Sequence, residues 1–74
     1  MNIEVQGTEF PTEGEAIQHT DASGRGVAIR IGGKNLVVEQ AEADRIAAQG
    51  ASFAYLTLHE MPDGSTRIVT VPIN

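Results

Sequence analysis

The chain has 74 residues, no cysteine and a formal net charge of -5 at pH 7. This length suits one small domain, near the lower limit for a self-sufficient hydrophobic core. The absence of cysteine excludes disulfides and thiolate metal ligands, and the negative charge argues against nucleic acid as a partner. No apolar run approaches the ~20 residues that cross a bilayer, and the N-terminus lacks a signal-peptide pattern. We therefore expect a cytoplasmic protein without membrane contact.

The net charge is confined to the first third of the chain. Residues 1–24 contain no lysine or arginine, whereas acidic and basic residues balance over residues 25–74. We expect a single domain over residues 1–74 with an acidic N-terminal segment, residues 1–24, in which part of residues 7–25 is mobile. The acidic side chains of this segment form a candidate contact for a basic protein partner. They are Glu4, Glu9, Glu13, Glu15 and Asp21.

The N-terminal segment contains two candidate strands. Residues 2–6 alternate between apolar and polar side chains, which is the period of a strand. Glycine, threonine and proline between residues 7 and 14 predict turns. Residues 15–19 are then a second short strand, and the polar stretch after it is a turn or loop.

Residues 26–31 and 35–39 predict a β-hairpin. β-branched residues alternate in the first run, and Leu36 opens an apolar run in the second. Glycine and asparagine lie between the two runs and tolerate positive φ. We expect either a two-residue turn at Gly33-Lys34 or a four-residue loop over residues 32–35.

Residues 40–49 predict a helix, because they are rich in alanine and contain neither glycine nor proline. Gly50 suits the left-handed position that ends a helix, which would let Ala51 rest on Ile46. No good N-cap residue precedes the segment. The face that we expect to meet the sheet is narrow and consists of Ala43, Ile46 and Ala47.

Residues 53–60 and 66–73 predict a second hairpin. Proline, aspartate and glycine at positions 62–64 fit a type I turn with a G1 bulge, which places Met61 opposite Ser65. The register then runs from a Glu60–Thr66 pair to a Phe53–Ile73 pair. One face of the hairpin carries Ala54, Leu56, Leu58, Ile68 and Pro72. The other face carries Phe53, Tyr55, Val69, Val71 and Ile73, with His59 and Arg67 near the turn.

Both faces of this hairpin are apolar, and one helix about 15 Å long covers only part of one face. The N-terminal segment, a second copy of the chain or a partner protein must cover the rest. We take the second face as the candidate interface: Phe53, Tyr55, Val69, Val71, Ile73, His59 and Arg67.

The elements together predict an α+β fold: a small, mainly antiparallel twisted sheet or half-open barrel of four to six strands with one helix. The helical connection would place strand 53–60 parallel to strand 35–39 if the two were neighbours.

No motif in the chain indicates catalysis, and we expect neither a cofactor nor a bound metal. His19 and His59 lack the spacing of zinc ligands. Ser23 lacks the glycine spacing of a nucleophile elbow. The glycines around Arg25 and Lys34 fit turns and match no phosphate-binding loop.

These observations favour a non-enzymatic interaction or structural domain that self-associates through the hairpin of residues 53–73. A first alternative is an acidic inhibitor or adaptor that docks on a basic protein. A second is a ligand-binding or catalytic site at a dimer interface, containing His59 and Arg67.

Overall fold

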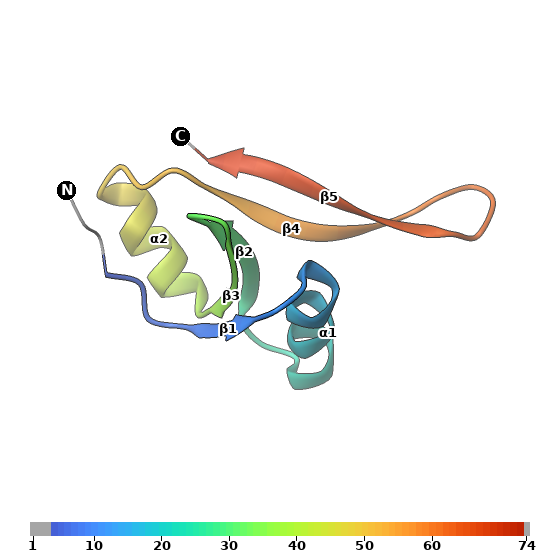
Figure 1. The fold of residues 1–74 in the computed structure, drawn as a ribbon, viewed down its shortest axis with the longest axis horizontal. Coiled ribbons are helices and arrows are strands. Elements are labelled where there is room, and N and C mark those ends of the chain that lie inside the picture. The colour runs from blue at the N-terminus through green and yellow to red at the C-terminus, as the bar shows by residue number, and fades with distance from the viewer. Residues whose placement is uncertain (1–3, 74) are drawn as a thin grey trace.

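The computed structural model describes residues 4–73. Its elements are β1 (Thr8–Phe10), α1 (Glu13–Ser23), β2 (Val27–Ile31), β3 (Lys34–Val38), α2 (Gln40–Ala48), β4 (Phe53–Glu60) and β5 (Thr66–Ile73). The five strands form one open antiparallel sheet in the order β1-β3-β2-β4-β5 (Figure 1). The predicted α+β class and antiparallel sheet are confirmed, with one helix more than expected.

Each face of the sheet packs against one helix. Alternation along β2 directs Ala28 to the face covered by α1 and Ile29 to the face covered by α2. The α1 core consists of Ala16, Ile17, Ala28 and Leu56. The larger α2 core consists of Ile29, Leu36, Val38, Ala43, Ile46, Ala51 and Phe53.

The strand predicted over residues 15–19 is wrong, because this segment lies inside helix α1. The hydroxyl oxygen of Thr12, the N-cap, accepts a hydrogen bond from the Glu15 backbone N–H at 3.2 Å. At the other end Gly24 adopts φ 70° and donates its N–H to the Thr20 carbonyl at 2.9 Å. These two caps outweigh the weak helix propensity of Ile17 and Thr20, because they satisfy backbone groups that a helix end otherwise leaves unpaired.

The strand predicted over residues 2–6 is also wrong where it can be checked: residues 4–6 belong to no strand, and residues 1–3 lie outside the described residues. The edge strand is β1, further along, which pairs Glu9 with Leu36. The backbone of residues 4–6 is instead hydrogen-bonded to side chains of α2. The Gln6 N–H donates to Glu42 Oε2 at 2.8 Å, and Arg45 Nη2 donates to the Glu4 carbonyl at 2.6 Å.

The β2–β3 hairpin is confirmed, but its turn lies one residue earlier than predicted. Gly32 and Gly33 occupy the two turn positions with φ 57° and 77°, and Ile31 pairs with Lys34. Two positive φ values are typical of a type I′ turn, which matches the twist of the flanking strands. Two glycines meet this requirement, whereas lysine at the second position would be strained.

Helix α2 confirms the predicted ending. Gly50 adopts φ 86° and donates its N–H to the Ala47 carbonyl at 3.0 Å, while the Ala51 N–H donates to the Ile46 carbonyl at 3.0 Å. This is a Schellman motif, and it buries Ala51 in the same core as Ile46. The N-cap residue, Glu39, makes no side-chain capping bond, as expected.

Strand β4 is not a neighbour of β3. It pairs with β2 in antiparallel orientation, with Tyr55 opposite Ile29, so that β2 lies between β3 and β4. The chain therefore crosses over β2 through α2, and β4 reaches the position from which the long β4–β5 hairpin extends (Figure 1).

Candidate functional site

The β4–β5 hairpin has the predicted register, from the Glu60–Thr66 pair to the Phe53–Ile73 pair. At its tip the Met61 N–H donates to the Ser65 carbonyl at 2.7 Å, and the Gly64 N–H donates to the Met61 carbonyl at 3.0 Å. Gly64 has φ 89°. The predicted type I turn with a G1 bulge is therefore confirmed.

The outer half of this hairpin projects beyond the rest of the molecule. Strand β2 pairs with β4 at Tyr55 and Ala54, and the same register continued to the first residue of β2 brings Val27 opposite Thr57. Residues 58–68, which we name the arm, lie past that point. Figure 1 shows the hairpin reaching past α1 and the other strands, and the longest dimension of the molecule is 43 Å against 24 and 20 Å for the others.

The arm and its base expose apolar side chains on both faces. The exposed fractions are 48% for Leu58, 36% for Ile68, 37% for Val69 and 46% for Val71. Leu58 and Ile68 form a cross-strand pair on the α1 face, whereas Val69 and Val71 lie on the α2 face. A two-stranded ribbon is marginally stable by itself in water, so this arm gains from contact with further structure.

Helix α2 already covers the body end of the predicted interface face. Phe53 is 5% exposed and belongs to the core, with its ring edge-on to Tyr55 at 5.5 Å. Tyr55 and Ile73 are half-buried against the same core, and the Tyr55 hydroxyl accepts a hydrogen bond from Gln40 Nε2 at 3.3 Å. Phe53 therefore has little surface left for a partner.

The outer residues of the predicted interface remain accessible. His59 and Arg67 form an exposed cross-strand pair near the turn, as the register requires. The hairpin register places Leu58 and Ile68 on the opposite face, so the interface predicted from the sequence leaves these two residues out. The lengths of the elements indicate that these residues stay exposed. A helix of nine residues is much shorter than a strand of eight residues, so it leaves the outer part of the hairpin uncovered.

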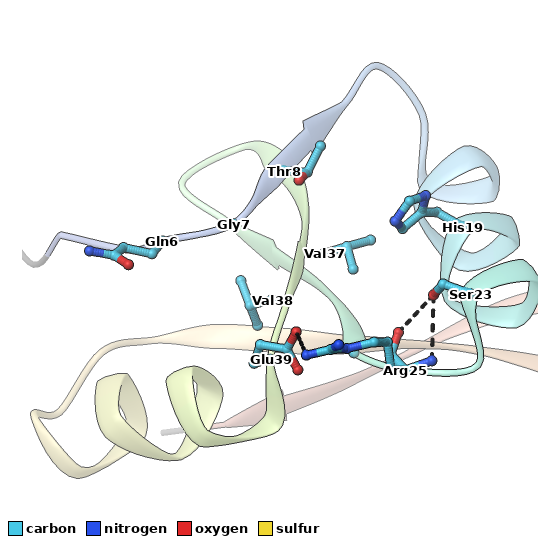
Figure 2. Close-up of a pocket in the computed structure, with 10 residues that line it drawn as sticks. Gln6, Gly7, Thr8, His19, Ser23, Arg25, Val37, Val38 and Glu39 are labelled. Carbon is cyan, nitrogen blue, oxygen red and sulfur yellow. Dashed lines mark hydrogen bonds and ion pairs between the residues drawn. The ribbon is translucent and has the colours of Figure 1, made fainter.

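A second candidate place is a hollow of about 260 Å³ between β1, β3 and the end of α1. Figure 2 shows His19 and Ser23 on α1, with the Arg25–Glu39 ion pair nearby. The Ser23 hydroxyl donates to the Arg25 carbonyl at 3.0 Å and so stabilises the turn after α1. The ring of His19 lies 5.1 Å from that of Phe10. The Arg25–Glu39 pair is largely exposed. We see no nucleophile and base in contact among these residues.

The histidines do not come together, since His19 lies on α1 and His59 on the arm. Within residues 4–73, no group of three or more histidine, aspartate and glutamate side chains is arranged to hold a metal ion. No helix in this part of the chain is long and apolar enough to cross a membrane.

The five acidic candidates fall into two places. Glu13, Glu15 and Asp21 lie on α1 and Glu9 on the adjacent β1, whereas Glu4 lies beside α2. Glu13 is partly neutralised, because its Oε1 lies 3.9 Å from Arg30 Nη1.

Comparisons of the chain with protein-family models, curated proteins and solved structures find no match.

Proposed function

We propose that the protein is a non-enzymatic interaction domain that self-associates through the outer part of its β4–β5 hairpin. The observation that carries the proposal is the exposure of apolar side chains on both faces of the arm and its base, Leu58 and Ile68 on one face and Val69 and Val71 on the other. Strand β5 of this hairpin is also an edge of the sheet. Such surfaces are typical of protein–protein contacts.

A second copy of the chain is the simplest occupant of this surface. Both copies gain from the same contact, and a small domain increases its buried apolar area by pairing.

The test is the molar mass of the chain, measured by light scattering over a range of concentrations. We expect the mass to rise from 7.9 kDa toward twice that value as concentration increases. Ile68→Lys should weaken the association about tenfold or more, because it places a charge in the contact. The matched control is Thr8→Lys, which adds the same charge to the opposite edge strand and should leave the association unchanged.

A constant mass of 7.9 kDa up to millimolar concentration, in a chain whose circular dichroism shows it to be folded, would overturn the proposal. Equal weakening by Ile68→Lys and Thr8→Lys would also contradict it, because a general charge effect would then explain the result.

A further inference from the structure

We infer that the second copy joins along the open edge of β5, antiparallel to it, with the two-fold axis at Ile68. This inference rests on the proposed function and specifies its geometry. Within residues 4–73, β5 is hydrogen-bonded along β4 only and ends the sheet. Its other edge therefore has unpaired backbone groups that can template a further strand.

The register of the hairpin identifies which backbone groups face that edge. Met61 and Ser65 exchange a hydrogen bond across the hairpin, so their groups point between the two strands. Because this direction alternates along a strand, Arg67, Val69 and Val71 also point toward β4. The open edge therefore presents the backbone groups of Thr66, Ile68, Thr70 and Pro72.

The edge is nearly self-complementary about Ile68. Antiparallel pairing centred there places Ile68 opposite its own copy, Thr66 opposite Thr70, and Arg67 opposite Val69. The N–H groups of Thr66, Ile68 and Thr70 then meet the carbonyls of Thr70, Ile68 and Thr66 of the other copy. All the donors that the edge offers in this stretch are paired, and identical cross-strand pairs add side-chain contact.

Pro72 selects this register over the next one. Centring the axis on Thr70 would bring Pro72 opposite Ile68 of the other copy, where its ring supplies no N–H and obstructs close approach. Centring the axis on Ile68 brings Pro72 opposite Gly64, in the turn that closes the arm, where the ladder ends.

The same register joins exposed apolar side chains. Leu58 and Ile68 are a cross-strand pair on the α1 face. Two copies therefore form a row of Leu58, Ile68, Ile68 and Leu58 across the four central strands. The arms overlap antiparallel, so the body of each copy lies beyond the tip of the other. The strands of the two copies pair over only a few residues, and such a contact buries less surface than a large obligate interface does. We therefore expect weak, concentration-dependent association.

Cysteine cross-linking tests the register directly, because the chain has no cysteine of its own. Opposite residues in a hydrogen-bonded antiparallel pair have Cα atoms about 5.5 Å apart, within disulfide range. Ile68→Cys alone should therefore form a disulfide-linked dimer under mild oxidation. Thr70→Cys alone should not, because the register sets its two copies ~14 Å apart.

A second measurement keeps Ile68 intact. A mixture of Thr66→Cys and Thr70→Cys chains should form mixed disulfide dimers, while each variant alone remains uncross-linked. Cross-linking of Thr70→Cys alone, or absence of the mixed dimer, would overturn the register. If the unmodified chain still dimerises by light scattering, the proposed function survives that result. If the unmodified chain is monomeric, both the proposed function and the proposed register are wrong.

Discussion

Glu42 shows how one side chain connects two distant parts of the chain. Its carboxylate accepts two hydrogen bonds from Arg45, both at 2.7 Å, and one from the Gln6 backbone N–H at 2.8 Å. The hydrogen bonds from Arg45, followed by the one from Gln6, lower the pKa of Glu42 from 4.5 to about 2. The same ion pair raises the pKa of Arg45. At the tip of the arm, hydrogen bonds from Ser65 similarly lower the pKa of Asp63.

The Glu42 contact should make stability depend on pH in acid. Because the folded-state pKa lies below the ordinary value, the contact contributes fully above pH 4.5 and is lost as pH falls through about 2. We expect Glu42→Gln to lower the melting temperature at pH 7 and the difference from the unmodified chain to shrink between pH 4.5 and 2. Thermal melts followed by circular dichroism measure this. Glu9→Gln, at an exposed position on β1, is the control. A difference independent of pH would contradict the assignment.

Helix α1 is the element on which the sequence-based prediction failed most clearly. Thr12 and Glu15 have the spacing of a capping box. Gly24 is the residue type that commonly ends a helix in the left-handed conformation. These signals indicate a helix, but the segment contains Gly14 and few apolar residues. Its packing against the sheet buries Ala16 and Ile17, which explains why so short a helix forms.

Removal of the N-cap should destabilise α1 measurably. We expect Thr12→Ala to lower the free energy of unfolding by about 1 kcal/mol, because the Glu15 N–H loses its side-chain partner. Thr12→Ser keeps an accepting hydroxyl and should stay close to the unmodified chain. Urea unfolding curves provide the comparison. Equal loss in the two variants would mean that the methyl group of Thr12, and not the capping bond, stabilises the helix.

At the scale of the whole molecule, the arm and the charge act in opposite directions. The arm favours contact between copies, whereas each copy carries a net charge of -5 and repels the other. The screening length falls from ~30 Å at 0.01 M ionic strength to about 8 Å at 0.15 M. Salt therefore reduces the repulsion between two copies more than it affects their apolar and backbone contacts.

We expect added salt to strengthen self-association several-fold over this range of ionic strength, measured as the dimer fraction by sedimentation equilibrium. Docking of the acidic residues on a basic protein would respond in the opposite way, because screening weakens attraction between unlike charges. A dimer fraction that falls with salt would contradict the arm as the main contact. The Ile68→Lys variant is the control, and its dimer fraction should stay below that of the unmodified chain at every ionic strength.

The sequence by itself determined the local structure of the β4–β5 hairpin and of the end of α2. The turn residues around Gly64 set the register of β4 and β5, and Gly50 set the end of α2. Such features depend on the backbone preferences of a few adjacent residues, and these can be recognised without a fold.

Only the tertiary structure decided which surfaces stay open. It placed α1 over Leu56 and α2 over Phe53, and it left Leu58 and Ile68 beyond both helices. The covered residues Leu56 and Phe53 and the exposed residues Leu58 and Ile68 are all apolar and all fit the alternation of a strand. The alternation therefore cannot distinguish a covered position from an exposed one. The difference arises because strand length, helix length and the pairing of β2 with β4 together set how far the core extends.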